Sequence, residues 1–304
     1  MIEIKDLSIA YGDNIVLDKV SLTANKGEII GLAAPNGTGK TTLFNVMANY
    51  TKPDSGKVKF NGKYTYKTEK DQIKIHEQLA TFPNQSDLFE ELSGLDHMKL
   101  YKNMWRGKKN IQTIVNELNM DHYVRNKVKT YSLGMRQRLC FAMMVAADSP
   151  IMLMDEVMNG LDVSNVSLIS NKLMEMKRED KLIFIASHLL ENLDLYADRV
   201  LFLKGGKFIH EHKPNRHEKA YIKINVTEEE YKVIKEKYIL GEDHEYISQL
   251  LCIPFSHLSF NEQIEMIETL LEYDEELAIG PLGTLEYYEK YFQELNQLKA
   301  TSRS

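Results

Sequence analysis

A segment of small residues separates a buried strand from a helix near the beginning of the chain. Glu28 to Ala33 is a short apolar run of the kind found inside a sheet, and a helical pattern follows from about Lys40 to Asn49. The residues between them read Ala34-Pro35-Asn36-Gly37-Thr38-Gly39-Lys40-Thr41-Thr42. Small residues let backbone amides curl around phosphate groups, and the helix start adds its positive pole. The segment predicts a phosphate-binding loop for ATP; the alternative is a plain glycine-bearing turn before a helix.

The polar residues of this loop have separate expected roles. Lys40 is expected to reach the β- and γ-phosphates, Thr41 to offer its hydroxyl to Mg²⁺, and Thr42 to help hold the α-phosphate side. Ala34 stands where the usual pattern has its first glycine, so the match is imperfect. The predicted nucleotide-binding residues of the loop are Asn36, Gly37, Thr38, Gly39, Lys40, Thr41 and Thr42.

Two adjacent carboxylates follow a second buried strand. The apolar run Ile151 to Met154 leads directly into Asp155 and Glu156. Alone, an acidic pair after a strand is usually the start of a solvated loop. Downstream of a phosphate-binding loop, we expect Asp155 to help hold Mg²⁺ and Glu156 to orient or deprotonate the attacking water.

Strands and helices alternate along the first two thirds of the chain. Helices are expected at Leu133 to Ala147 and Ser164 to Arg178, and a buried strand at Leu182 to Ile185. This alternation predicts an α/β core around a largely parallel sheet. A boundary is expected near Lys213-Pro214-Asn215, which divides a nucleotide-binding domain, 1–213, from an accessory domain, 214–304.

The segment after this boundary differs in composition. Ala220 to Val226 alternates as a strand, and the rest, to about Leu298, is mostly helical in pattern, which predicts a small α+β extension. From Arg216 onward, nine Lys and Arg stand against 18 Asp and Glu, whereas the whole chain has a net charge of −6. An acidic tail on a nearly neutral body argues against nucleic acid as the main partner.

Composition points to a cytoplasmic protein. The longest dense apolar stretches fall short of the roughly 20 residues that cross a bilayer, and the amino terminus does not have the pattern of a secretory signal. Cys140 and Cys252 have no metal-ligand spacing. A disulfide and a lone nucleophile are both open, but two buried, inert thiols in a reducing cytosol are favoured.

Tyr131-Ser132-Leu133-Gly134-Met135-Arg136-Gln137-Arg138 resembles the signature motif of the ABC ATPase family. In that family, the signature serine and glycine contact the γ-phosphate that the opposite protomer binds. The resemblance therefore implies this role for Ser132 and Gly134. An ordinary N-capped amphipathic helix that begins at Ser132 is compatible with it.

Further motifs of the family follow in its order. Tyr11 lies where an aromatic side chain stacks on adenine, although it otherwise reads as a strand tyrosine. Asn159-Gly160-Leu161-Asp162 resembles the D-loop, with Asp162 at the dimer seam. Ser187-His188 resembles the switch histidine, which contacts the γ-phosphate. The resemblance covers about residues 1–213.

Phe82-Pro83-Asn84-Gln85 occupies the position of the family's Q-loop. Alignment on Pro83 places Asn84, rather than Gln85, at the position of the metal-contacting glutamine. Either amide could contact Mg²⁺ or order water, so both are candidate metal residues together with Thr41 and Asp155.

The resemblance implies a P-loop NTPase fold with a β-rich subdomain, a RecA-like parallel-sheet core and a helical subdomain. Two departures are present: Leu133 replaces a common glycine, as in ATPases of bacitracin-type bacterial export systems, and Val157-Met158 replaces the usual Pro-Thr. Because Lys40, Asp155, Glu156, Ser132 and His188 are all present, we expect hydrolysis, with Glu156, His188 and Lys40 as the catalytic residues.

The function that the resemblance implies is that of an ATP-binding and hydrolysing subunit of an ABC transporter. It would form a homodimer or a heterodimer with a second ATPase on binding ATP and Mg²⁺. It would power a separate transmembrane permease from the inner face of the cell membrane, with residues from Gln85 to about Arg106 meeting the permease. Export of a peptide, an antibiotic or an amphipathic compound is expected; the alternatives are an importer ATPase or a soluble, non-transport regulatory ATPase.

Two weaker clusters have ordinary explanations. His210, His212 and His217 crowd one segment and suggest a metal, but no cysteine accompanies them. Trp105-Arg106-Gly107-Lys108-Lys109 could touch lipid headgroups or a partner, but a solvated loop is the simpler interpretation.

Overall fold

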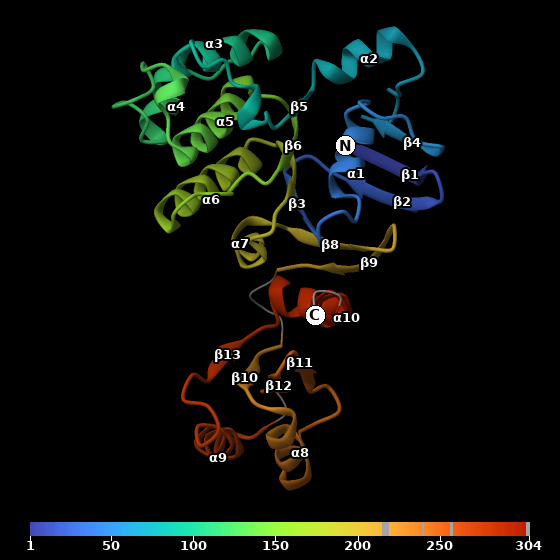
Figure 1. The fold of residues 1–304 in the computed structure, drawn as a ribbon, viewed down its shortest axis with the longest axis vertical. Helices are drawn as coiled ribbons and strands as arrows, with labels where there is room; N and C mark the ends of the chain where they lie inside the picture. The colour runs from blue at the N-terminus through green and yellow to red at the C-terminus, as the bar shows by residue number, and fades with distance from the viewer. Residues whose placement is uncertain (215–218, 239, 256–257, 302–304) are drawn as a thin grey trace. The chain divides into compact units, whose positions relative to one another are not determined.

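The computed structural model describes residues 1–214, 219–238, 240–255 and 258–301. The chain divides into two compact units, Met1–Lys213 and Pro214–Ser304. Each unit has its own sheets and helices (Figure 1).

A six-stranded sheet forms the centre of the first unit. Its strands lie in the order β5 (Leu79–Thr81), β6 (Ile151–Asp155), β7 (Leu182–Ala186), β3 (Glu28–Ala33), β8 (Arg199–Lys204) and β9 (Lys207–His212). All neighbours pair in parallel except β8 and β9. β7 is buried at every residue because both faces of a parallel sheet are covered. The carboxyl ends of β6, β7 and β3 therefore meet at one edge of the sheet.

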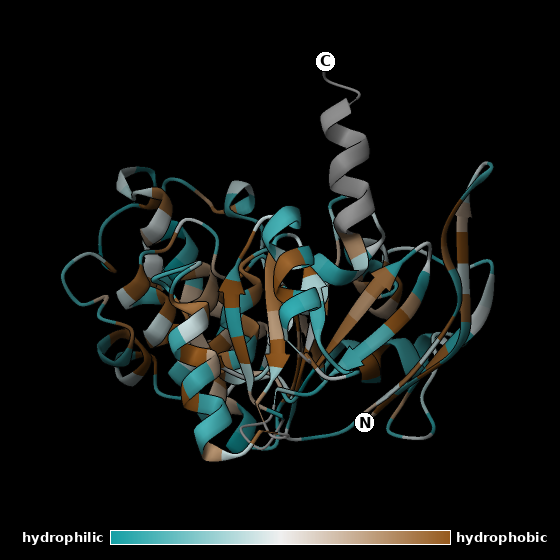
Figure 2. Cartoon of the chain, turned by 90° about the horizontal axis from the view of Figure 1, so that it is seen from below, coloured by the Kyte–Doolittle hydropathy of each residue, from teal (hydrophilic) through white to brown (hydrophobic). Residues whose placement is uncertain are grey.

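A second, antiparallel sheet contains the amino terminus. It consists of β2 (Asn14–Ala24), β1 (Ile2–Tyr11) and β4 (Ser55–Phe60), in that order. Buried Ile2 and Ile4 alternate with more exposed residues, as in a sheet with one solvated face. Figure 2 shows hydrophobic and hydrophilic residues alternating along strands of the chain.

Helices complete the first unit. They are α1 (Lys40–Met47), α2 (Glu69–His76), α3 (Gly94–Trp105), α4 (Ile111–Glu117), α5 (Leu133–Ala147), α6 (Val163–Arg178) and α7 (Leu190–Tyr196), with 3₁₀ turns η1 (Gln85–Asp87) and η2 (Val128–Thr130). The predicted helix from Leu133 to Ala147 is confirmed at both ends. α3 and α4 pack against α5, and the three gather on one side of the unit (Figure 1).

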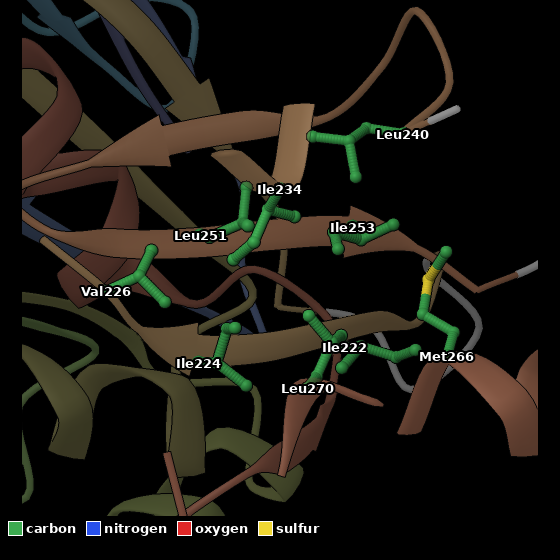
Figure 3. Close-up of a cluster of buried hydrophobic side chains, with 9 residues drawn as sticks. All are labelled: Ile222, Ile224, Val226, Ile234, Leu240, Leu251, Ile253, Met266 and Leu270. Atoms are coloured by element: carbon green, nitrogen blue, oxygen red, sulfur yellow. The ribbon is translucent and has the colours of Figure 1, made fainter. Parts of the chain in front are cut away.

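The second unit is built on a four-stranded antiparallel sheet. Its strands lie in the order β11 (Glu245–Ile247), β12 (Leu250–Pro254), β10 (Tyr221–Asn225) and β13 (Ala278–Gly280). The helices are α8 (Glu228–Lys237), α9 (Phe260–Leu270) and α10 (Thr284–Thr301). Apolar side chains from β10, β12, α8 and α9 form its core (Figure 3).

The segment after Val226 is mostly helical, as expected, but it also contains three short strands that the sequence pattern did not predict. β11 and β12 form a hairpin whose two connecting residues, Ser248 and Gln249, have φ of 49° and 74°. Such a turn usually announces itself by Asn-Gly or Asp-Gly, and Ser-Gln provides no comparable signal. The α+β character expected of this unit is present.

Two features of composition have structural counterparts. Among the described residues, none of the helices is both long enough and apolar enough to cross a membrane. Cys140 and Cys252 lie in different units, are buried and are not disulfide-bonded. Burial raises the pKa of both thiols to about 12, which makes them poor nucleophiles.

Candidate active site

The loop between β3 and α1 has the backbone of an anion-binding site. Gly37 and Gly39 have φ of 78° and 109°. A Cβ on Gly39 would lie 2.9 Å from Val16 Cγ1, so only glycine fits there. Thr38 Oγ1 donates to Pro35 O at 2.8 Å and tightens the loop. No side chain caps the amino end of α1, so its first amides remain available to an anionic group.

Lys40 is buried at the start of α1. Its Nζ donates to Ala34 O at 2.6 Å and to Pro35 O at 3.1 Å. Burial lowers the pKa of Lys40, and Glu156 and Asp155 partly oppose this. Ala34 is not among the residues with positive φ, so its backbone does not require the glycine of the usual pattern. The cation lies inside the loop that is predicted to hold phosphates.

Thr41 and Asp155 meet, as their expected shared role requires. Thr41 Oγ1 donates to Asp155 Oδ2 at 2.7 Å. A hydroxyl and a carboxylate are oxygen donors, and Mg²⁺ is usually bound by one or two such protein groups together with phosphates and waters. The pair therefore fits Mg²⁺.

Glu156 and His188 also meet at this edge of the sheet. His188 Nε2 lies 2.7 Å from Glu156 Oε1. Burial is the main cause that raises the pKa of Glu156, and the nearby His188 acts in the opposite direction. Glu156 has φ of 56°, an uncommon conformation for a residue with a side chain, and its N–H donates to Ala186 O at 2.9 Å.

The two candidate amides of the 82–85 segment have different partners. Asn84 caps η1, and its side chain accepts from Ser86 N at 3.0 Å. Gln85 Nε2 donates to Gln137 Oε1 on α5. Both amides line a cavity of about 940 Å³ with Thr41, Asp155 and Glu156, among other residues. Which of the two contacts Mg²⁺ stays a prediction.

The signature residues lie at the amino end of α5. Ser132 is the N-cap, and its Oγ accepts from Met135 N at 3.3 Å. Gly134 lies against Gly160 of the predicted D-loop: a Cβ on Gly134 would be 3.5 Å from Gly160 O. In the part of the chain that the structure describes, no hydrogen bond joins Ser132 to the loop 34–42. The role of Ser132 and Gly134 toward a second chain stays a prediction.

Two other predicted residues sit at ends of elements. Tyr11 ends β1 and is 56% exposed, so a face of its ring is open to a flat ligand. Asp162 caps α6 by accepting from Asn165 N at 2.9 Å. Stacking of Tyr11 on adenine and the place of Asp162 at a dimer seam stay predictions.

The two weaker clusters find structural explanations. Trp105 is half-buried, and its Nε1 donates to Leu79 O at 2.9 Å, so it ties α3 to β5. His210 and His212 lie on β9, whereas His217 falls outside the described residues. Among the described residues, no three His, Cys, Asp or Glu side chains gather as a metal site.

Sequence reasoning missed Gln137, a buried amide on α5. Its Nε2 donates to Glu156 O at 2.7 Å, while its Oε1 accepts from Gln85. The available signal is its position in the helix, one turn before buried Phe141, where an apolar residue is expected. A polar residue on a buried helix face needs partners, and here both come from the site.

Comparisons with known proteins agree with this geometry. The ABC transporter family matches residues 17–159. An uncharacterized ABC transporter ATP-binding protein of Methanocaldococcus jannaschii is 34% identical over 69% of this chain and 76% of its own. The bacitracin transport ATP-binding protein BcrA of Enterococcus faecalis is 28% identical over 75% of both chains.

A solved structure shares the fold. The dimeric ATP-binding cassette MJ0796, in a post-hydrolysis state bound to ADP and Pi, superposes with a TM-score of 0.62 at 22% identity, over 71% of this chain and 99% of its own. The predicted P-loop ABC ATPase fold is thereby confirmed. With a phosphate loop, a Thr41–Asp155 pair and a Glu156–His188 pair on three adjacent strands, the chain belongs to the ABC transporter family as one of its ATP-binding, ATP-hydrolysing subunits.

Proposed function

We propose that two cassettes close on ATP, each completing the other's site, and drive a separate transmembrane permease that exports its cargo. The observation that carries the proposal is the division of the site. Lys40, Asp155 and Glu156 converge at the carboxyl edge of the sheet, whereas exposed Ser132 points its helix end at solvent. A helix amino end attracts anions, so a γ-phosphate held by a second chain is its natural partner.

The chemistry follows from the positions of the charged groups. Lys40 neutralises charge on the β- and γ-phosphates, while Thr41 and Asp155 hold Mg²⁺, which neutralises more. Glu156, whose carboxylate is held by His188, orients or deprotonates the attacking water. His188 is 39% exposed at its side chain, so it can also reach the γ-phosphate. Loss of that phosphate removes the contacts that favour the closed dimer.

The cavity of the site has an apolar side, called the groove below, which supports a permease partner. The large cavity is lined by Phe89, Leu100, Tyr101 and Met104, all within the stretch from Gln85 to Arg106. Phe89 and Met104 are 59% and 60% exposed, which is unusual for apolar side chains grouped on one surface. This apolar lining suits a helical segment of the permease. The subunit would accordingly work as a peripheral protein at the inner face of the membrane.

Export is favoured over import by similarity. BcrA is named for bacitracin transport. Leu133 replaces a common glycine of the signature motif, a replacement that resembles the bacitracin-type systems. A peptide, an antibiotic or an amphipathic compound is therefore the proposed cargo. Uptake and efflux in vesicles that contain the permease decide between the two directions: ATP-driven uptake into right-side-out vesicles would contradict export.

Mixing two inactive chains tests the shared site. Lys40→Ala removes the phosphate-binding cation of one site, and Ser132→Arg blocks the signature helix of the other. Each variant alone should lose ATP hydrolysis, but a mixed dimer contains one intact site, so mixing should restore part of the rate. A mixture of wild type and Ser132→Arg is the control and should form half-active dimers. If that control works but the two variants stay inactive when mixed, a site built from two chains is contradicted.

A further inference from the structure

Gln137 connects three parts of the first unit through one buried side chain. It is 3% exposed on α5. Its Oε1 accepts from Gln85 on η1, and its Nε2 donates to the backbone carbonyl of Glu156 at 2.7 Å. Both ends of the amide are therefore used, one by the loop that lines the groove and one by the segment that carries the catalytic base.

The backbone at Glu156 is held on both sides of its Cα. The N–H donates to Ala186 O on β7 at 2.9 Å, and the carbonyl accepts from Gln137. Between them, φ is 56°, a left-handed conformation that costs on the order of 1–3 kcal/mol for a residue with a side chain. Such a conformation persists only where its surroundings hold it. Gln137 supports the carbonyl together with Asn159, whose N–H donates to the same oxygen at 3.2 Å, and β7 supports the N–H.

A second contact joins the same helix to the same segment. Leu133 packs against Gly160, because a Cβ on Gly160 would lie 2.9 Å from Leu133 Cδ2. Gly134 also lies beside Gly160 O. α5 thus contacts both ends of the segment 156–161. Gln137 forms a hydrogen bond with Glu156 at one end, and Leu133 packs against Gly160 at the other. A displacement of α5 would move the segment with it.

We propose that Gln137 is a positioning residue for hydrolysis, which holds the Glu156 backbone so that its carboxylate faces His188. Through Gln85, it also makes this position depend on the 82–85 loop. The inference rests on the proposed role of Glu156 as the base. Gln137 acts only through the carbonyl of Glu156.

The two hydrogen bonds of the Gln137 side chain should differ in their importance for Glu156. Loss of the Gln137 donor leaves the carbonyl of Glu156 without that partner in a largely buried place, which favours relaxation of the left-handed backbone. Loss of the Gln85 donor leaves the bond to Glu156 in place but frees the Gln137 side chain to turn. The first change should therefore disturb the base more than the second.

The central experiment replaces Gln137 by leucine in the full-length chain. Leucine keeps the bulk of the side chain and removes both hydrogen bonds. We expect kcat for ATP to fall by about 100-fold, the loss that a misplacement of ~1 Å can cause, while KM and nucleotide affinity stay within about twofold. An unchanged kcat would overturn the proposal.

A double-mutant cycle separates a relay from two independent effects. Gln85→Leu should lower kcat by about 10-fold, and the double variant should be no slower than Gln137→Leu alone, because residues that share one path are not additive. Losses that multiply would contradict the relay. A Mg²⁺ titration distinguishes the other candidate role of Gln85: the relay leaves the magnesium requirement unchanged, and a raised requirement would assign Gln85 to the metal instead.

A matched control separates positioning from loss of packing. Met144→Ala is the control, because Met144 is fully buried on the same helix and has no part in the site. It should lower Tm yet leave kcat unchanged; a loss of kcat equal to that of Gln137→Leu would mean that α5 packing is the cause.

Two further variants keep the result interpretable. If Gln137→Leu does not fold, Gln137→Glu keeps the acceptor for Gln85 and removes the donor to Glu156, with the same expected loss of kcat. Glu156→Gln in the same assay tests the proposed function by itself. If Glu156→Gln is inactive and the Gln137 variants are normal, only the positioning role fails. If Glu156→Gln still turns over, the assignment of the base fails first.

Discussion

The two units of the chain differ in what they bury. Around its sheet, the first unit buries Lys40 and Gln137 and partly buries Glu156, which sits in a left-handed conformation. Among the described residues of the second unit, Thr284 is the only polar side chain in the buried class, and nine apolar side chains form the core. Buried polar and charged groups cost free energy unless they are paired. In the first unit, Lys40 and Gln137 lie at the candidate site and have such partners there.

Positive φ serves different purposes at two places in the units. In the second unit, Ser248 and Gln249 adopt positive φ where a hairpin turn requires it. In the first, Glu156 adopts positive φ directly after a strand, with its backbone bonded to β7 and to α5. The positive φ of Ser248 and Gln249 forms a turn, whereas that of Glu156 sets the position of its side chain. We therefore expect substitutions in the first unit to change the reaction and those in the second to change stability.

The largest expected effect is that of Glu156→Gln. Removal of a general base should lower kcat by roughly 100- to 10,000-fold, and the ATP-bound dimer should accumulate. The raised pKa means that the folded state disfavours the charged carboxylate, so at neutral pH the neutral amide should leave Tm unchanged or raise it. Phosphate release and size-exclusion chromatography with ATP measure both. If Glu156→Gln hydrolyses ATP at the normal rate, the expected difference between the two units is contradicted.

A core substitution in the second unit should do the reverse. Ile253→Ala, at a position 1% exposed on β12, should destabilise that unit by about 2–5 kcal/mol and leave ATP hydrolysis at wild-type rate. Ile183→Ala, on fully buried β7, is the matched control and should lower stability and activity together. Thermal melts with parallel ATPase assays test this. If Ile253→Ala lowers both the melting temperature and the ATPase rate, the units do not act separately.

The pH dependence of hydrolysis should reveal the buried carboxylate. Because burial raises the pKa of Glu156, the base becomes protonated at a higher pH than an ordinary glutamate. kcat should therefore fall as pH drops through this raised value, by roughly tenfold per pH unit below it. Steady-state rates at saturating ATP check the prediction, with nucleotide affinity measured at each pH. An acid limb at the ordinary glutamate pKa would show that Glu156 is solvated during turnover.

The smallest expected effect compares two helix caps. Thr227 and Ser93 each form a capping box, on α8 in the second unit and on α3 in the first. Thr227→Ala and Ser93→Ala should each cost about 1 kcal/mol of stability. Only Ser93→Ala should also lower the permease-stimulated ATPase rate. Loss of the cap loosens the first turn of α3, where the backbone carbonyl of Ser93 is bonded to His97 Nδ1 at 2.8 Å, and His97 Nε2 accepts from Phe89 N beside the groove. Denaturant unfolding and permease-stimulated ATPase rates separate the two.

Much of the candidate site could be predicted from the sequence. Strands that end in Ala33, Asp155 and Ala186 are short apolar runs, and each is followed directly by the residues of the site. Parallel strands deliver their carboxyl ends to one edge, so the meeting of Thr41 with Asp155 and of Glu156 with His188 follows from local pattern alone. Helix caps such as Ser132 are likewise local features.

Only the tertiary structure decided what joins these parts. The alternation of Ala220 to Val226 predicts β10. The strands β11, β12 and β13 depend on pairing between segments distant in the sequence and on a hairpin turn without a glycine, so no local pattern predicted them. The bonds of Gln137 to Gln85 and to Glu156 link residues 52 and 19 positions apart, and nothing in the neighbourhood of Gln137 specifies its partners. Sequence periodicity reports which face of an element is buried. It does not report which atoms that face meets, because these are set by how the elements pack.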